Sequence, residues 1–486
     1  MNETSILNNF KGESIVSLNR HSIIDRGNYL IMIIPDTGAW ITVEHCDIEL
    51  VSYLARPVTI HGLKEKTKEC PRLSEFLDDL FYSGLIQING KDVSMITQID
   101  RGEKKKKGYG LPTFWVLKYT NACNLRCAYC YSYDKNLTKP VAIPNEYVYK
   151  ISDLIGETED ENVLSLCFHG GEPLTRFKDI VECVKHLDEI RHGDIEYTIQ
   201  TNGTLLTPAI AKYLKEHDFG VGISVDGYNE STNKLRPFAN HYPSINATLN
   251  AIKNCINVGI TPGVISVLTK NNYLQAIEIM EDLSKRGIKS FHFIHFLPSG
   301  RGEHKEKDFS VPIQELIETR KRILLYINDT NANLDPKNHI SERLTRNIIK
   351  RLTNIGDISY MCAKSPCGAG REMLALTYDG SIYPCDDFCG NEDFRIGNIN
   401  EIVNLRETLA TSRAVYYCQN HCVENIPKCK SCLFKKICIS HCCSDSYYYT
   451  GSFNSPHSSC EFVQSFIPIV IDLIHDGRIQ VENLVH

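Results

Sequence analysis

Three cysteines lie within one short stretch of the chain, at Cys123, Cys127 and Cys130. A structural zinc site takes four protein ligands, and so does an iron–sulfur cluster that is bound only by protein. Three thiolates on one loop can bind three irons of a four-iron cluster, which leaves the fourth iron open to a small molecule. Taken alone, the three residues also allow a zinc knuckle or a group of buried thiols.

The loop resembles the cluster loop of the radical S-adenosylmethionine (radical SAM) enzymes, in which an aromatic residue such as Tyr129 precedes the last cysteine. This resemblance implies that Cys123, Cys127 and Cys130 bind a [4Fe–4S] cluster whose open iron takes S-adenosylmethionine. Alone, the motif leaves the zinc interpretation open, so the rest of the chain must decide.

Further motifs follow the loop in the family's order, each at the end of an expected strand. They are the segment 169–173 (His-Gly-Gly-Glu-Pro), the segment 200–203 (Gln-Thr-Asn-Gly) and the segment 224–227 (Ser-Val-Asp-Gly). Glycines let the backbone approach a ligand closely, and a glutamate accepts hydrogen bonds from an ammonium group. In the family these places contact the methionine amino group, the ribose and the carboxylate. The resemblance implies cofactor-binding roles for Tyr129, Gly170, Gly171, Glu172, Asn202, Ser224 and Arg236.

A second group of cysteines begins near residue 362. The spacing of these cysteines resembles that of SPASM domains, which carry auxiliary iron–sulfur clusters. It reads Cys-x12-Gly-x4-Cys, then Cys-x2-Cys-x5-Cys-x3-Cys, and then one more cysteine. The resemblance implies a first auxiliary [4Fe–4S] cluster on Cys362, Cys367, Cys385 and Cys442. It implies a second on Cys429, Cys432, Cys438 and Cys460. Both would be closed, with four thiolates each. Two zinc ribbons are the alternative.

Other residues of this region carry further expectations. Asp386 follows Cys385 directly, and in sulfatase-maturating relatives an aspartate at this place is a base toward the substrate. The resemblance therefore implies that Asp386 is catalytic, while a turn-capping role is the alternative. Cys418 and Cys422 are expected to be surface thiols, with metal binding as the alternative, and Cys443 competes with Cys442 for its ligand role.

Strand-like and helical segments alternate from residue 114 onward, which predicts a parallel sheet wrapped by helices. The expected strands are 114–119, 163–168, 197–200, 221–225, 264–267 and 291–296, and the expected helices 147–155, 180–190, 208–217, 245–258 and 274–286. Six strands are too few for a closed eight-stranded barrel. The expected fold class is therefore α/β, with the partial (β/α)6 TIM-like barrel of the radical SAM family. Residues 297–300 close the sixth strand and are expected to line the site.

Residues 1–108 contain none of the clustered cysteines. Two strand-like segments at 29–34 and 39–43 flank a turn and predict a hairpin, and helices at 47–54 and 73–80 precede a strand at 85–88. This order predicts a winged-helix-like domain. In outline it resembles the leader-peptide recognition elements of peptide maturases, and simple packing on the core is the alternative. The expected domains are 1–108, a radical SAM core at 109–330 and an iron–sulfur SPASM domain at 331–486, with a linker at 101–110.

Composition limits the partners of the chain. Of its 486 residues, 42% are hydrophobic and 23% charged, as in globular proteins. A net charge of −6 and one short lysine run at 104–107 predict neither a nucleic acid nor a membrane partner. The amino terminus lacks signal-peptide features, and the apolar stretch 466–474 is too short to span a bilayer. Clustered cysteines without a signal peptide predict metal binding in the reducing cytoplasm.

Together the resemblances imply an enzyme that cleaves S-adenosylmethionine reductively and oxidatively modifies a peptide or protein, for example with a thioether or carbon–carbon crosslink. They also imply a peptide substrate with a leader segment and a one-electron reductant such as flavodoxin or ferredoxin. The first alternative is an anaerobic sulfatase-maturating enzyme, which makes formylglycine from Ser or Cys. Others are small-molecule chemistry and a non-catalytic iron–sulfur electron carrier, which would have no use for the motif at 169–173.

Overall fold

The computed structural model describes residues 10–67, 70, 72–91, 110–133, 139–156, 163–191, 195–355, 358, 361–438 and 441–485. It contains two compact units, one made of Met1–Gly108 with Lys428–Cys438 and the other of Tyr109–Pro427 with Ile439–His486. The expected linker and its lysine run lie outside the described residues, apart from Gly110.

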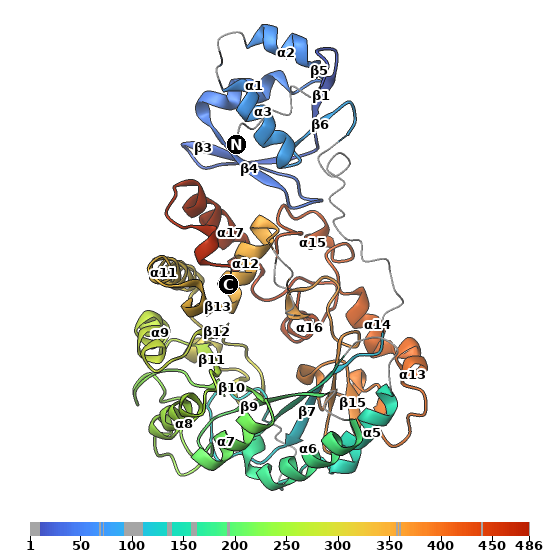
Figure 1. Cartoon of the computed structure of the whole chain (residues 1–486). Coiled ribbons are helices and arrows are strands. Elements are labelled where there is room, and N and C mark those ends of the chain that lie inside the picture. The colour runs from blue at the N-terminus through green and yellow to red at the C-terminus, as the bar shows by residue number, and fades with distance from the viewer. Residues whose placement is uncertain are drawn as a thin grey trace. The chain divides into compact units, whose positions relative to one another are not determined.

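In its described residues, the N-terminal part of the first unit contains two small antiparallel sheets and three α-helices, which Figure 1 shows in blue. One sheet is β2 (Ser22–Asp25), β3 (Tyr29–Ile33) and β4 (Trp40–Glu44), and the other has the order β5 (Val58–Thr59), β1 (Ile15–Leu18) and β6 (Ile86–Ile88). The helices are α1 (Ile48–Tyr53), α2 (Ile60–Lys66) and α3 (Leu73–Tyr82). The predicted hairpin is confirmed by the pairing of β3 with β4. The short elements β1, β2 and α2 were not predicted.

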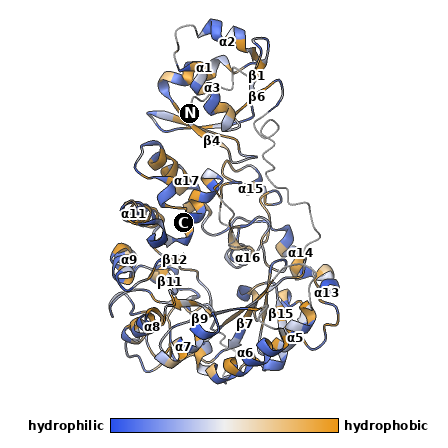
Figure 2. Cartoon of the chain, in the orientation of Figure 1, coloured by the Kyte–Doolittle hydropathy of each residue, from blue (hydrophilic) through white to orange (hydrophobic). Residues whose placement is uncertain are grey.

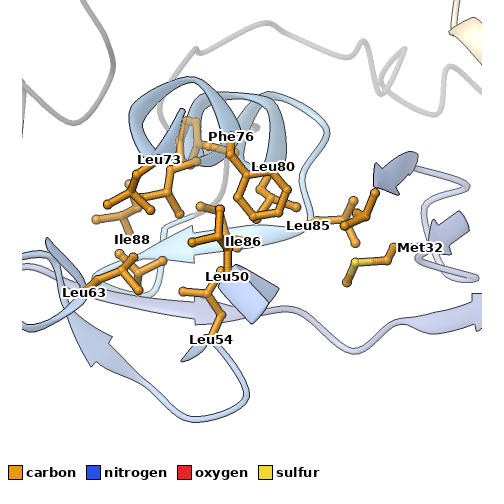
Figure 3. Close-up of a cluster of buried hydrophobic side chains, with 14 of the residues drawn as sticks. Met32, Leu50, Leu54, Leu63, Leu73, Phe76, Leu80, Leu85, Ile86 and Ile88 are labelled. Carbon is orange, nitrogen blue, oxygen red and sulfur yellow. The ribbon is translucent and has the colours of Figure 1, made fainter. Parts of the chain in front are cut away.

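A single apolar core stabilises this unit. The amphipathic helix α3 places Phe76, Leu77 and Leu80 on one face, and these side chains are buried. Figure 3 shows this face packed over Ile86 and Ile88 of β6.

The second unit is built on a ten-stranded sheet with the order β13-β12-β11-β10-β9-β8-β7-β14-β15-β16. Strands β7 to β13 are parallel and follow chain order. They are β7 (Phe114–Thr120), β8 (Leu164–Gly170), β9 (Ile195–Thr201), β10 (Gly220–Ser224), β11 (Gly263–Leu268), β12 (Ser290–His295) and β13 (Ser341–Glu342). The six predicted strands are confirmed as β7 to β12. Strands β13 to β16 extend the sheet beyond the prediction.

Helices connect the parallel strands and cover the outer face of the curved sheet (Figure 1). They are α5 (Asn145–Ile155), α6 (Phe177–Arg191), α7 (Pro208–Glu216), α8 (Ile245–Asn257) and α9 (Ala276–Lys285). In α9 the buried residues Ala276, Ile279, Met280 and Leu283 recur at helical spacing. Figure 2 accordingly shows hydrophobic and hydrophilic residues mixed along each of these helices.

The chain after β12 contains the remaining α-helices of the described residues. Its helices are α10 (Glu306–Phe309), α11 (Ile313–Asn331), α12 (Arg343–Thr353), α13 (Leu405–Thr411), α14 (Arg413–Asn420), α15 (Pro427–Lys430), α16 (Cys443–Thr450) and α17 (Cys460–His475). Among the described residues, no helix has the length and apolar character needed to cross a membrane.

The cysteine-rich region joins the sheet directly. Strand β14 (Met373–Leu376) pairs in parallel with β7, and β15 (Ser381–Tyr383) and β16 (Gly397–Asn398) follow as antiparallel neighbours. All four residues of β14 are buried. The barrel strand that leads into the cysteine loop is therefore flanked by the region that carries Cys385 and Asp386.

Candidate functional site

The cysteine loop follows β7 and is fixed by backbone hydrogen bonds on two sides. Arg126 N–H donates to the Pro237 carbonyl at 2.8 Å, and Ala128 N–H donates to the Leu235 carbonyl at 2.9 Å. On the other side, Arg301 N–H donates to the Cys130 carbonyl at 3.0 Å. These contacts set the backbone that presents the three thiols.

The expectation that residues 297–300 lie at the site agrees with their contacts. Gly300 has a φ of +56°, and a Cβ there would lie 2.2 Å from the Cys130 carbonyl oxygen. Only glycine fits this close approach of two backbone segments.

The glycines of the 169–173 motif pack against the start of the loop. Gly171 N–H donates to the Thr120 carbonyl at 2.6 Å, and Glu172 N–H donates to the Ala122 carbonyl at 2.7 Å. A Cβ on Gly171 would lie 2.4 Å from the Ala122 oxygen. The sequence predicts that these glycines let the backbone approach a ligand closely. In the structure they also let the motif pack closely against the cysteine loop of the same chain.

Glu172 is fully buried and accepts three hydrogen bonds. Thr201 Oγ1 donates at 2.6 Å, Asn202 N–H at 2.7 Å and Leu174 N–H at 3.1 Å. Burial raises the pKa of the Glu172 carboxyl, and these hydrogen bonds oppose the shift. Asn202 Nδ2 in turn lies 3.8 Å from Cys123 Sγ. The structure thus brings the predicted residues Glu172 and Asn202 next to the first cysteine.

Tyr129 connects the loop to two buried charged residues. Its hydroxyl donates to Asp226 Oδ2 and accepts from Arg236 Nη1 at 3.0 Å. Burial raises the pKa of Asp226, while the Arg236 charge lowers it. Asp226 was not singled out from the sequence, although it stands in the motif at 224–227. Ser224, which was predicted, accepts a hydrogen bond from Gln200 Nε2 at 3.0 Å.

Asp386 lies in a polar group beside the last cysteine of the loop. Tyr131, which follows Cys130, donates its hydroxyl hydrogen to Asp386 Oδ2 at 2.8 Å. Lys118 Nζ of β7 forms an ion pair with the same oxygen at 3.7 Å. His169 Nε2 lies 3.4 Å from the Tyr131 hydroxyl. The sequence did not predict Lys118, Tyr131 or His169 as site residues, although Tyr131 follows Cys130 and His169 begins the motif at 169–173. Lys118 lies within β7 and had no such signal.

Two consecutive carboxyls of this region have opposite pKa shifts. Burial opposes ionisation of Asp386, but Lys118, His169 and the Tyr131 hydrogen bond together keep its pKa below the usual value. Burial and the neighbouring Asp386 charge raise the pKa of Asp387 to about 6. Ser444 Oγ donates to Asp387 Oδ2 at 2.8 Å. Because their pKa values are shifted in opposite directions, Asp386 is suited to accept a proton and Asp387 to donate one.

The four cysteines predicted for the first auxiliary cluster all belong to the second unit. Cys367 and Cys385 are buried in one apolar cluster, and burial, with a smaller contribution from the neighbouring Cys442, raises the pKa of both thiols. The Cys362 carbonyl accepts a hydrogen bond at 3.3 Å from the backbone N–H of His441, the residue before Cys442.

Two further cysteines lie in the same group, which corrects one prediction. Cys418 was expected at the surface but is fully buried and forms a hydrogen bond with the buried Cys443. The reason is that α14 packs Ala414, Val415 and Cys418 into the core. Cys443 is the first residue of α16.

The cysteines predicted for the second auxiliary cluster lie in different parts of the chain. Cys429, Cys432 and Cys438 belong to Lys428–Cys438 of the first unit, where each is partly buried. Cys432 N–H donates to the Cys429 carbonyl at 3.0 Å. Cys460 begins α17 of the second unit.

The chemistry of the donor sets fits iron–sulfur clusters. Thiolates are the usual cluster ligands, and Cys123 Sγ also accepts a hydrogen bond from Leu125 N–H at 3.4 Å. Burial raises the pKa of Cys127 to about 12, and a bound metal reverses such a shift because it deprotonates its thiol ligands. In the described part of the chain, no three His, Cys, Asp or Glu side chains are grouped as the ligands of a single metal ion.

Comparisons with known proteins identify two families. The model of the radical SAM superfamily matches residues 117–282, and that of the SPASM iron–sulfur cluster-binding domain matches residues 367–433. A protein of Methanocaldococcus jannaschii, named only as uncharacterized, is 36% identical over 62% of this chain and 93% of its own length. A cysteine-type anaerobic sulfatase-maturating enzyme of Clostridium novyi is 27% identical over 71% of this chain and 91% of its own length.

Solved structures have the same fold at low identity. The structure of anSMEcpe with bound AdoMet has a TM-score of 0.65 at 20% identity and covers 75% of this chain and 98% of its own. Streptococcus suis SuiB bound to the precursor peptide SuiA has a TM-score of 0.55 at 18% identity and covers 91% of this chain and 99% of its own.

The ordered motifs, their convergence on the cysteine loop and the family matches lead to one conclusion. The chain belongs to the radical SAM superfamily, as an enzyme with a SPASM domain that uses [4Fe–4S] clusters and S-adenosylmethionine.

Proposed function

We propose that this enzyme is a maturase that oxidatively modifies a peptide or protein substrate. The observation that carries the proposal is the place of Asp386, a residue of the SPASM region, beside Tyr131 at the end of the cysteine loop. If the reaction removes a proton from the substrate, in addition to a hydrogen atom and an electron, an ionised carboxylate is needed there to accept that proton. That combination is a net two-electron oxidation, such as formation of a thioether or a carbon–carbon bond.

The residues of the cofactor site have separate roles in this proposal. When bound, S-adenosylmethionine and its cluster would supply a 5′-deoxyadenosyl radical able to take a hydrogen atom from a substrate carbon, and an auxiliary cluster held by the SPASM cysteines would take up the remaining electron. Glu172 would accept a hydrogen bond from the ammonium group of the cofactor, and Asn202, Ser224 and Arg236 would contact its polar groups. Gly170 and Gly171 let the motif lie against the loop. Tyr129 orients Arg236.

Asp386 then acts on the substrate. It accepts the proton that the substrate releases when the new bond forms, because Lys118 and Tyr131 stabilise its ionised form. Asp387, whose pKa is raised to about 6, is the neighbouring group that can carry a proton near neutral pH.

We further propose a division of labour along the chain. Residues 1–108 bind a leader segment of the substrate, residues 109–330 form the radical SAM core, and residues 331–486 contain the auxiliary clusters. The likeness to SuiB, which was solved with a precursor peptide and covers 91% of this chain, supports peptide recognition. Among the described residues, the small sheets of the N-terminal unit end in β5 and β6 and in β2 and β4, and an extended peptide can add a strand to an edge of a sheet.

Sulfatase maturation is a second candidate function. It is favoured by the place of Asp386 directly after Cys385, where the resemblance to sulfatase-maturating enzymes implies a base, and by the 27% identity to the Clostridium novyi enzyme. In that case the substrate is a Cys or Ser side chain in a sulfatase, and the product is formylglycine.

The test is anaerobic incubation of the full chain with reductant, S-adenosylmethionine and two kinds of peptide. One is a precursor peptide encoded beside this protein's gene, and the other is a sulfatase segment with its target Cys or Ser. A precursor peptide that becomes lighter by two hydrogen atoms supports crosslinking, whereas an aldehyde on the sulfatase segment supports the second candidate. If 5′-deoxyadenosine forms but neither peptide changes, the peptide-maturase proposal is wrong.

A further inference from the structure

The turn between β3 and β4 contacts a segment from the far end of the sequence. Lys428–Cys438 groups by its contacts with the N-terminal unit, apart from the rest of the cysteine-rich region. This segment carries Cys429, Cys432 and Cys438, three of the four cysteines assigned above to the second auxiliary cluster.

Lys435 connects the turn to the cysteines. Its ammonium forms an ion pair with Asp36 of the turn, and it also donates to the Lys430 carbonyl at 3.4 Å. The backbone N–H of Lys435 donates to the Cys432 carbonyl at 3.4 Å. One residue therefore fixes the chain on both sides of Cys432 and links it to Asp36.

Gly38 brings the turn into close packing with the same segment. Its N–H donates to the Ile34 carbonyl at 2.8 Å, and its φ is +77°, which favours glycine. A Cβ at this position would lie 3.1 Å from Lys436 Cβ and 3.3 Å from Ile437 Cγ1. Ile437 is buried, so it has little room to move.

We propose that the β3–β4 turn positions the second auxiliary cluster. Asp36 acts through Lys435, and Gly38 through its packing, to fix the backbone that presents Cys429, Cys432 and Cys438. Residues around metal ligands orient those ligands and tune the metal. The unit that receives the peptide in the proposed function thus also shapes one electron acceptor. The inference depends on the ligand assignment and not on the identity of the substrate.

The contact is well suited to a test because Asp36 is largely exposed, at 69% of its side-chain surface. An exposed ion pair contributes only about 0–1 kcal/mol to stability, so its loss leaves the fold intact. The variants are Asp36→Asn and Gly38→Ala. The control is Gly27→Ala, because Gly27 also has a positive φ, of +87°, in the preceding turn, but a Cβ added there would have no other atom within 4 Å.

The measurement is anaerobic release of iron from the reconstituted holoenzyme to a chelator, followed by electron paramagnetic resonance of the reduced protein. We expect about four of about twelve irons to leave roughly 10-fold faster in Asp36→Asn and Gly38→Ala, with one cluster signal changed. Gly27→Ala should match the wild type. Equal release from all variants overturns the proposal.

A second measurement tests the contact itself. A carbodiimide joins a carboxylate to an amine that touches it, so the wild-type holoenzyme should yield a cross-linked peptide containing Asp36 and Lys435. Its absence overturns the contact. A wild-type protein that binds only about four irons instead overturns the cluster assignment, even if the cross-link forms. Neither result depends on finding a substrate.

Discussion

At the scale of single residues, the site depends on close packing and on buried polar groups around the cysteine loop. Gly171 can pack against the backbone of the cysteine loop because it has no side chain. The Tyr129 hydroxyl forms hydrogen bonds with both Asp226 and Arg236 and so connects the loop to these two residues. The lowered pKa of Asp386 depends on three neighbours that come from separate strands or loops, Lys118, Tyr131 and His169. Each dependence can be tested by one substitution.

Replacing Gly171 by alanine should disrupt the cysteine loop. The added Cβ would lie 2.4 Å from the Ala122 carbonyl, a backbone atom that cannot move without moving the loop. We expect loss of S-adenosylmethionine binding by calorimetry and of 5′-deoxyadenosine by chromatography. Gly263→Ala is the control, because its Cβ has its nearest neighbour at 4.0 Å. If both variants bind the cofactor equally, the packing argument fails.

Tyr129→Phe should weaken cofactor binding without unfolding the protein. The change removes the donor to buried Asp226 and leaves polar groups unsatisfied, at a cost of about 1–3 kcal/mol. We expect the Kd for S-adenosylmethionine to rise about 10-fold. The control is Tyr213→Phe, since the Tyr213 hydroxyl has no hydrogen-bond partner among the described residues. Unchanged affinity in Tyr129→Phe would contradict a role for this hydroxyl.

Asp386→Asn should separate radical formation from product formation. The amide cannot accept a proton, so product formation should fall by about 100-fold or more, while 5′-deoxyadenosine still forms. Both products are measured by mass spectrometry in the same reaction. Equal loss of the two products would instead indicate a structural role for Asp386.

At the scale of elements, the pairing of β14 with β7 connects the barrel to the cysteine-rich region. Leu374 to Leu376 of β14 are fully buried against this sheet. The register of this pair determines where the segment after β15 meets Lys118. A change in β14 should therefore affect both stability and the position of Asp386.

Leu374→Ala tests this connection. Truncation of a fully buried leucine costs about 2–5 kcal/mol, so the midpoint of thermal unfolding should fall. Product formation should fall more than 5′-deoxyadenosine formation, because the cysteine loop does not follow β14. Val403→Ala is the control, since Val403 is 94% exposed and its change should cost at most about 0.5 kcal/mol. A stable Leu374→Ala variant with full activity would contradict the role of this pairing.

At the scale of the whole molecule, the assigned cysteines predict three clusters. The reconstituted chain should bind about twelve irons, and replacing Cys123, Cys127 and Cys130 by alanine should leave about eight. The same variant should form no 5′-deoxyadenosine. The matched control replaces three cysteines outside the ligand sets, Cys46, Cys183 and Cys255, and should keep all clusters. Loss of all iron from the loop variant would show that the clusters are not independent.

The sequence by itself determined the chemistry of the site and the order of the core strands. The reason is that cluster ligands and strand-end motifs are short, local patterns: the spacing of Cys123, Cys127 and Cys130 and the glycines before Glu172 can be read without knowing the fold. The six barrel strands were predictable for the same reason, since apolar runs alternate with helical patterns. Sequence alone placed Cys418 wrongly at the surface, because burial of α14 depends on its packing partners.

Only the tertiary structure decided which distant segments meet. The ion pair of Lys118 with Asp386 follows from the pairing of β14 with β7, and that of Asp36 with Lys435 from the packing of Lys428–Cys438 on the N-terminal hairpin. Neither contact has a local signal, because Asp386 and Lys435 look like ordinary polar residues in their own segments. Such contacts are set by the sum of many non-local packing interactions, which a pattern along the chain does not contain.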